Sequence, residues 1–382
     1  MNRRLLALAL ILFALVVLLG SGILIYSLLN SNSPNQPPGT GTATVSTTQA
    51  VHSGNGCGVK HNNDGTYAFS WLHVSSDGKI VDQNNCIVHL LGLDSGWLAS
   101  DSTGGPDAQT IASWKQAIPT NLVRIAYNSY WWNVDIYVPK YKMHFRQLLQ
   151  NFVKWNEQNG NYVELDTHTQ FSWPPCGSDG LTVNVTYCST EEGPAISPQD
   201  HETYLPRAVQ GLTDLAKLYA NDPAVIFDVW NEPAGLKISQ QEYLQDMNAR
   251  INTVRTYAPR SLVVVFSHGL KQIKSGQLPL YTQPNLVIDF HSYNPNFTAN
   301  DLLPLVTFCQ QHGYGVIVNE YGGTKDTPGE QQAMTDLAKN YSVNLSYFNA
   351  SNLTGSNAAP IKLNSIGQMV SASYASIFGN TN

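Results

Sequence analysis

Two glutamates far apart in the chain are the residues best suited to chemistry. Glu232 follows a β-favouring run at 224–230, and Pro233 then ends that run because proline cannot continue a strand ladder. Glu320 follows a second β-favouring run at 315–319. Parallel α/β folds carry their sites at the carboxyl ends of buried strands, so both carboxylates are candidates for one site.

Paired carboxylates suit the hydrolysis of a glycosidic bond. One protonated carboxyl protonates the leaving oxygen, and one ionised carboxylate stabilises or attacks the sugar carbon. With about 5–5.5 Å between the two groups, the reaction retains the configuration of the sugar. We expect Arg124 and the hydroxyl of Tyr293 to hold Glu320 in its ionised form.

The elements that must position these residues alternate between buried strands and amphipathic helices, which predicts a parallel sheet. For example, apolar residues share one helical face over 244–254, and Thr327 with Pro328 opens another helix. Eight strands over about 300 residues favour a single (β/α)8 TIM barrel over an open doubly wound sheet, and no G-x-G-x-x-G follows the first strand. The predicted strands are 87–93, 122–126, 162–166, 225–230, 262–266, 286–290, 315–319 and 343–348. A short antiparallel β-hairpin is predicted before the barrel, within 58–88.

The strand ends that face the βα loops of this barrel are unusually polar. Each residue alone is as compatible with a structural role as with a catalytic one, but their convergence on one rim indicates a site. They are Asp94, Arg124, Asp166, His168, Asn231, Glu232, Ser267, His268, His291, Tyr293, Glu320 and Tyr321.

Several of these segments resemble one known family. Trp-Asn-Glu-Pro at 230–233, Val-Asn-Glu-Tyr-Gly at 318–322 and His-Ser-Tyr at 291–293 resemble the fourth-, seventh- and sixth-strand signatures of cellulase-like glycoside hydrolases of family 5, in clan A. The segments 123–125 and 165–168 resemble that family's second- and third-strand motifs. The resemblance runs from about residue 58 to the carboxyl terminus.

The resemblance implies a retaining hydrolase of β-linked polysaccharide, either β-glucan or cellulose-like, or mannan, that needs no cofactor and no metal. Glu232 would be the acid/base and Glu320 the nucleophile, while Asn231 would bind the sugar 2-hydroxyl. The other residues that it assigns to the substrate site are Arg124 and Tyr293, which would support Glu320, and His168 and His291, which would line the sugar site.

Aromatic side chains are further candidates for the substrate site, because flat rings stack on the apolar faces of sugars. Trp131 and Trp132 follow the second strand directly, and Trp97 lies in a loop. The chain also departs from the family pattern. The eighth strand offers only Tyr347 and Phe348 where the family usually has tryptophan, and the first strand ends in aspartate where asparagine is common.

The chain divides into three segments. Residues 1–30 hold two arginines and then an uncharged apolar run, which predicts a transmembrane anchor or a cleaved signal peptide. Residues 31–56 are rich in Ser, Thr, Pro, Gly and Asn and predict a flexible linker. Residues 57–382 form the predicted barrel, which the positive-inside rule places outside the cytoplasm, either anchored to the membrane or secreted.

The cysteines agree with an oxidising location. Cys57 and Cys86 flank the start of the predicted barrel domain, and Cys176 and Cys188 flank a loop, so we predict two disulfides. Cys309 falls on an apolar helical face and is predicted to be an inert buried thiol.

Other classes of function fit less well. A net charge of -6 excludes a nucleic acid partner, and the histidines lack the spacing H-E-x-x-H of a zinc site. Ser267 and His268 are adjacent on a strand, so they point to opposite faces and cannot form a nucleophile–base pair. We expect a monomer that acts on polysaccharide or oligosaccharide. The alternative is a catalytically inactive barrel that binds carbohydrate at the cell surface.

Overall fold

The centre of the fold is a closed barrel of eight parallel strands, in which neighbours in the chain are neighbours in the barrel. The structure is a computed structural model that describes residues 57–95, 106–169, 198–232, 240–267, 281–323, 326–354 and 359–379. The strands are β5 (Leu91–Asp94), β6 (Leu122–Asn128), β9 (Tyr162–Thr169), β10 (Val225–Asp228), β11 (Val263–Phe266), β12 (Leu286–Ser292), β13 (Gly315–Tyr321) and β14 (Asn344–Tyr347). The barrel and all eight of its predicted strands are confirmed.

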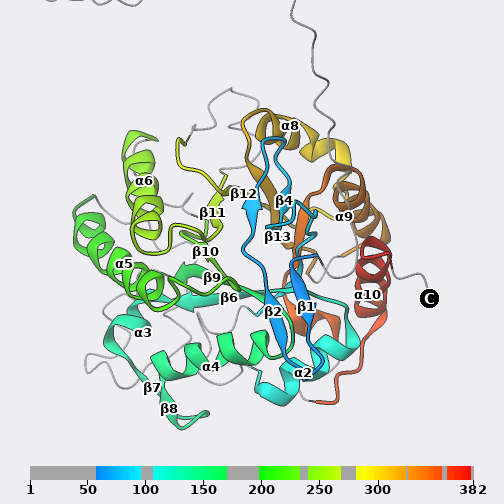
Figure 1. The fold of residues 1–382 in the computed structure, drawn as a ribbon, viewed down its shortest axis with the longest axis horizontal. Coiled ribbons are helices and arrows are strands. Elements are labelled where there is room, and N and C mark those ends of the chain that lie inside the picture. Colours follow the sequence, from blue (N-terminus) through cyan, green and yellow to red (C-terminus); the bar gives the residue numbers. More distant parts are fainter. Residues whose placement is uncertain are drawn as a thin grey trace, which may run out of the picture. The chain divides into compact units, whose positions relative to one another are not determined.

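Helices surround this barrel, as Figure 1 shows. Their apolar faces pack on the strands to form the main core, and Met247, Ile251 and Val254 of α6 are fully buried, as predicted. Thr327 caps α9 by accepting the Glu330 N–H at 3.2 Å. The helices are α2 (Ala108–Ala117), α3 (Ser129–Val134), α4 (Phe145–Glu157), α5 (Pro198–Leu218), α6 (Gln240–Tyr257), α8 (Ala299–Gln311), α9 (Pro328–Tyr341), the 3-10 helix η4 (Ala350–Leu353) and α10 (Ser365–Ile377). A short ribbon of β7 (Tyr137–Val138) and β8 (Met143–His144) lies between α3 and α4.

Two small antiparallel sheets precede the barrel, where the sequence predicted one hairpin. The predicted hairpin is β3 (His73–Val74) with β4 (Ile80–Val81), and the additional one is β1 (Val59–His61) with β2 (Tyr67–Phe69). Leu72 and Ile80 pack against residues at the amino ends of the barrel strands, including Tyr162. The Tyr162 hydroxyl also contacts the carbonyl oxygens of Gly58 and Ser70, at 2.8 and 2.9 Å. This packing closes the amino-terminal end of the barrel, so a site has to lie at the other end.

The cysteines of the described region behave as predicted. Cys57 and Cys86 form a disulfide with 5.6 Å between their Cα atoms, and Cys309 is fully buried on α8. Cys176 and Cys188 lie outside the described residues. The predicted anchor at 1–30 and the linker at 31–56 also lie outside them. Over the residues that the structure does describe, no helix has the length and apolar character needed to cross a membrane.

Candidate active site

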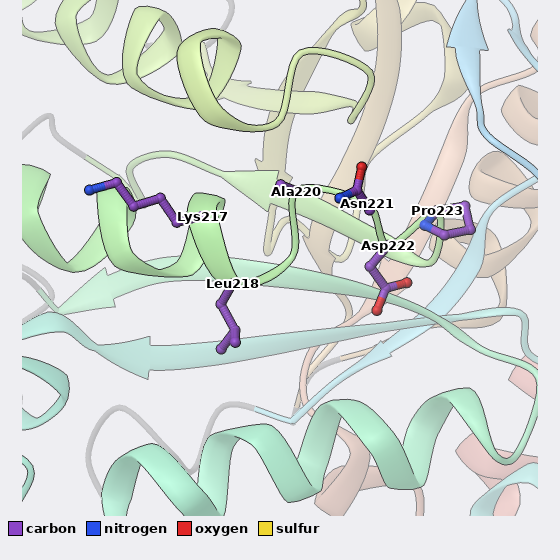
Figure 2. Close-up of a pocket in the computed structure, with 6 residues that line it drawn as sticks. All are labelled: Lys217, Leu218, Ala220, Asn221, Asp222 and Pro223. Atoms are coloured by element: carbon purple, nitrogen blue, oxygen red, sulfur yellow. The ribbon is translucent and has the colours of Figure 1, made fainter.

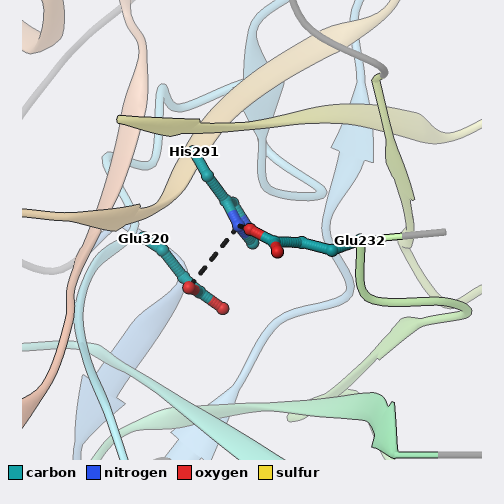
Figure 3. A group of neighbouring side chains, drawn as sticks. All are labelled: Glu232, His291 and Glu320. Carbon is teal, nitrogen blue, oxygen red and sulfur yellow. Dashed lines mark hydrogen bonds and ion pairs between the residues drawn. The ribbon is translucent and has the colours of Figure 1, made fainter. Parts of the chain in front are cut away.

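The two glutamates predicted to act together meet at the carboxyl ends of the barrel strands. Glu232 follows β10 and Glu320 is the second-last residue of β13, and His291 of β12 lies between them (Figure 3). One oxygen of Glu232, one oxygen of Glu320 and a ring nitrogen of His291 all lie within 4.8 Å of one another. The barrel thus brings together two carboxylates that are 88 positions apart in the numbered sequence.

Arg124 of β6 is the cationic centre of the site, and its guanidinium is fully buried. Its Nη1 donates to Asp94 Oδ2 and to Glu320 Oε1, both at 2.5 Å. Its Nη2 lies 2.8 Å from Asn231 Oδ1, 2.9 Å from Asp166 Oδ2 and 3.2 Å from Asp228 Oδ2. A single guanidinium therefore fixes side chains from four other strand ends.

Glu320 is buried, at 3% exposure, yet the site holds it in the ionised form. Burial by itself would raise the pKa of Glu320, but the positive charges of His291 and Arg124 outweigh it and lower this pKa to about 2. The Tyr293 hydroxyl also donates a short hydrogen bond to Glu320 Oε2. The expectation that Arg124 and Tyr293 support Glu320 agrees with these contacts.

Glu232 has a different environment. Its side chain is 25% exposed, and its Oε1 lies 2.5 Å from His291 Nδ1. The other ring nitrogen of His291, Nε2, lies 3.0 Å from Asp289 Oδ2. Glu320 Oε2 is also 3.5 Å from His291 Nδ1. Glu232 thus touches solvent and one imidazole, whereas Glu320 is enclosed by donors.

Asn231 and His168 join the same network. Asn231 Oδ1 accepts from Arg124, which leaves the amide Nδ2 of Asn231 as its donor toward a ligand. His168 Nδ1 lies 2.5 Å from Asp166 Oδ2, and the positive charge of His168 is a further cause that lowers the pKa of Glu320. Both residues thus belong to the network around Arg124, and their contacts with a sugar stay predictions.

The backbone is irregular beside both glutamates. Glu232 has φ +35°, a left-handed conformation that non-glycine residues rarely adopt and that is a source of strain. On β13 the pairing register shifts between Val318 and Tyr321, so that β12 pairs Phe290 with Val318 and then His291 with Glu320. The second feature is a β-bulge at Asn319, a device that re-aims side chains next to active sites.

The predicted aromatic platforms are not where the sequence suggested. Trp131 and Trp132 are buried, at 1% and 4% exposure, and belong to the main core. The Trp131 ring packs edge-on against Phe145, and Trp132 Nε1 donates to Asp214 at 3.4 Å. The prediction of sugar stacking is wrong for these two, because rings without exposed faces cannot stack on a substrate.

The other aromatic candidates differ in their exposure to solvent. Trp97 lies outside the described residues. Tyr347 is fully buried at the end of β14, whereas Phe348 is partly exposed and packs edge-on against the Tyr293 ring at 5.7 Å. Of the two aromatic residues at the end of the eighth strand, Phe348 is therefore the one beside the glutamate pair.

Three buried carboxyls of the barrel interior were not among the predicted site residues. They are Glu164, Asp228 and Asp289, each fully buried. Burial is the main cause that raises the pKa of Glu164 and of Asp228 well above its ordinary range. The sequence contained a signal for them, because each is a charged residue with an apolar neighbour on both sides. The hydroxyl of Ser267 donates to the backbone carbonyl of Asp289 at 2.6 Å, so it is not paired with a base as a nucleophile would be.

A metal ion fits this site poorly. Within the described residues, Glu232, His291 and Glu320 are the group whose ligand atoms lie close enough to hold one. However, both ring nitrogens of His291 already face carboxylate oxygens, so neither is free to bind a metal.

A pocket at the opposite end of the barrel lacks these features. Figure 2 shows it at the turn between α5 and β10, with a volume of about 280 Å³. Its lining residues are Lys217, Leu218, Ala220, Asn221, Asp222 and Pro223. Its one lining carboxylate, Asp222, interacts with Glu157 of α4. The pocket lies at the amino-terminal end of the barrel, away from the polar strand ends, so the catalytic candidates remain at the carboxyl-terminal rim.

Comparison with solved structures shows the same fold elsewhere. The catalytic domain of endoglucanase Cel5A of Thermobifida fusca gives a TM-score of 0.55 at 16% identity, covering 80% of this chain and 97% of that chain. The catalytic domain of the major endoglucanase of Xanthomonas campestris pv. campestris gives 0.57 at 15% identity, covering 80% and 99%. An endogalactoceramidase gives 0.56 at 18% identity, covering 82% and 78%. At these identities the likeness concerns the fold alone.

Sequence comparison identifies the family. Endoglucanase N of Pectobacterium atrosepticum is 26% identical over 160 residues, which are 39% of this chain and 35% of that protein. Endoglucanase A of Evansella cellulosilytica is 24% identical over 149 residues, which are 38% and 30%. The chain thus spans about a third of the length of these curated relatives. The model of the family Cellulase (glycosyl hydrolase family 5) matches residues 81–354, most of the barrel and more than half of the chain, and the chain therefore belongs to glycosyl hydrolase family 5.

Proposed function

We propose that this protein is a retaining endo- or exo-acting glycosidase that cleaves β-linked polysaccharide, with β-glucan as the first substrate to test. The observation that carries the proposal is the close approach of Glu232 and Glu320, whose nearest oxygens lie within 4.8 Å. Retaining enzymes separate their carboxyl groups by about 5–5.5 Å, whereas inverting enzymes need about 6.5–9.5 Å to admit a water. Membership of family 5 and the endoglucanase relatives support the substrate class.

The different environments of Glu320 and Glu232 support different roles for them. Glu320 accepts from Arg124 and Tyr293 and stays ionised, which suits the nucleophile. Glu232 is partly exposed and has His291 on Oε1, so Oε2 is the oxygen that carries the transferable proton. In the first step Glu232 protonates the leaving oxygen while Glu320 bonds to the sugar carbon. In the second step Glu232 takes a proton from water, which attacks the same carbon and releases Glu320.

A panel of polysaccharides tests this proposal. Wild type, Glu232→Gln and Glu320→Gln are assayed on β-1,4-glucan, mixed-linkage glucan, β-1,3-glucan, mannan and xylan, with Glu157→Gln at the end of α4 as the matched control. We expect each site variant to lose at least about a hundredfold in activity and the control to keep it. An unchanged rate in either site variant contradicts the assignment. Absence of cleavage by wild type, with polysaccharide still bound, favours an inactive carbohydrate-binding barrel.

Two further measurements separate the roles. The anomeric form of the first product, followed by proton NMR, should be the β anomer if configuration is retained. An aryl glycoside with a good leaving group needs no protonation of that group, so Glu232→Gln should still form the covalent intermediate from it. Glu320→Gln should form none, because it lacks the nucleophile.

We also propose that the enzyme works outside the cytoplasm, held by residues 1–30 or released after their cleavage. The disulfide between Cys57 and Cys86 supports an oxidising location. Mass spectrometry of the native amino terminus, together with alkaline carbonate extraction of membranes, distinguishes an anchored chain from a secreted one. Recovery of the native protein in the cytoplasm with both thiols reduced contradicts the proposal.

A further inference from the structure

His291 lies between three carboxyl groups, and this fixes its protons. Its Nδ1 is 2.5 Å from Glu232 Oε1 and 3.5 Å from Glu320 Oε2, and its Nε2 is 3.0 Å from Asp289 Oδ2 (Figure 3 shows the first two partners). A carboxyl oxygen that bears no proton only accepts hydrogen bonds, and with the Glu232 proton on Oε2 this holds for Glu232 Oε1. A neutral imidazole has one N–H, so satisfying both sides of the ring requires the doubly protonated, cationic form.

Asp289 is held rigidly beneath the ring. It is two residues before His291 on β12, so both side chains point to the same face of the strand. Asp289 is fully buried, and its Oδ1 accepts the backbone N–H of Asn319 at 3.2 Å. Its Oδ2 is left to face His291. The backbone of two neighbouring strands thus sets the position of this carboxylate.

We propose that Asp289 is a positioning residue that keeps His291 doubly protonated, so that the imidazolium orients Glu232 through Oε1 and holds Glu320 ionised. Asp289 does not touch the reacting atoms. Its role as an aid to catalysis rests on the proposed glycosidase function, whereas the charge state that it imposes on His291 does not.

The surroundings of His291 support this charge state. The groups that face it are Glu232 from the segment after β10, Glu320 from β13, Asp289 from its own strand and the Phe266 ring edge-on from β11. Burial alone would lower the pKa of His291, but Glu320 and Asp289 outweigh it and raise that pKa well above its ordinary range. Tyr293 adds no charge, since burial raises the pKa of its hydroxyl.

Nitrogen-15 NMR of histidine side chains tests the charge state without substrate. Wild type, Asp289→Asn and the matched control Asp228→Asn are titrated from about pH 5 to about pH 9, around the ordinary histidine pKa. A His291→Asn variant serves only to assign the His291 signal. Asp228 is another buried strand carboxyl, and it contacts Arg124 rather than His291. We expect His291 to stay doubly protonated in wild type and in Asp228→Asn, and to lose a proton in Asp289→Asn at a pKa lower by about two units or more.

The pH profile tests the effect on catalysis. In Asp289→Asn, His291 should lose its second proton at a lower pH than in wild type, so as pH rises the imidazolium beside Glu232 and Glu320 is lost earlier. The kcat/KM of Asp289→Asn should therefore begin to fall, as pH rises, at a pH lower by about one unit or more than in wild type. Parallel pH profiles in the two proteins overturn the proposed role.

The two proposals fail in different ways. A wild-type His291 that titrates like a free histidine overturns the positioning role of Asp289, whatever polysaccharide is cleaved, and this result does not depend on Asp289→Asn folding. A His291 that stays charged in a protein that cleaves no polysaccharide supports the charge state and contradicts the proposed function.

Discussion

Replacing Arg124 by lysine tests whether one guanidinium organises the site. The substitution keeps the positive charge and removes the planar group that carries N–H donors on three nitrogens. Arg124 uses Nη1 for two carboxylates and Nη2 for three further oxygens, all within 3.2 Å. A lysine has one nitrogen with three hydrogens, so at least two of these five contacts are lost. At about 1.5–3 kcal/mol for each hydrogen bond to a charged group, the loss is about 3–6 kcal/mol of unfolding free energy.

The assay is urea unfolding of wild type, Arg124→Lys and the control Arg255→Lys. Arg255 is also an arginine with several hydrogen bonds, three in number, which it donates to the backbone carbonyls of Ser261, Pro284 and Asn285. Replacing its guanidinium therefore leaves no carboxylate unpaired. We expect Arg124→Lys to lose at least about 2 kcal/mol more than the control. We also expect its kcat to fall about a hundredfold, because Glu320 loses the donor that positions it. Equal losses in the two variants would refute the reasoning.

Four further outcomes are expected. Tyr293→Phe should lower kcat about 10- to 100-fold and cost no more than about 3 kcal/mol of unfolding free energy, because it removes one hydrogen bond to an ionised carboxylate. Steady-state kinetics and urea unfolding check the two effects. The folded-state pKa of Glu320 is depressed to about 2, so its ionisation stabilises the fold above the unfolded-state pKa of about 4.5, and this stabilisation is lost as pH falls. In urea unfolding, the unfolding free energy of wild type should therefore fall by about 2 kcal/mol more than that of Glu320→Gln between about pH 6 and pH 3. Replacing Cys57 and Cys86 by serine should cost about 3–4 kcal/mol of unfolding free energy, since their disulfide closes a loop with a sequence separation of 29. Trp131→Ala should cost about 3–5 kcal/mol in the same assay and leave KM unchanged, whereas a higher KM at unchanged stability would restore its interpretation as a sugar platform.

The parts of the site that depend on strand ends were accessible from sequence. In a parallel barrel the residue that ends each strand faces the same rim, so Glu232, Glu320, Arg124 and His291 could be grouped without coordinates. Asp289 was equally accessible, because it precedes His291 by two positions and shares its face of the strand. It was missed because strand ends were considered and strand interiors were not.

The loop aromatics were not accessible in the same way. Trp131 and Trp132 follow β6 directly, but α3 begins at Ser129 and returns both rings to the core between helices. Position after a strand determines which end of the barrel a residue occupies, and it does not determine which way the side chain points. Composition also failed to distinguish them, since a tryptophan suits a core and a sugar platform equally.

The arrangement of the two Asn–Glu pairs explains why the strand pattern alone could not produce this site. Adjacent residues of a regular strand point to opposite faces, yet Asn231 contacts Arg124 while Glu232 contacts His291 at the same site. The left-handed backbone at Glu232 resolves this conflict after β10, and the bulge at Asn319 resolves it on β13, where Glu320 reaches Arg124. Two different departures from regular strand geometry thus serve one purpose, which is to turn two consecutive polar side chains toward the inside of the barrel. The strain at Glu232 persists because the fold fixes both of its neighbours, Asn231 through Arg124 and the ring of His291 through Asp289.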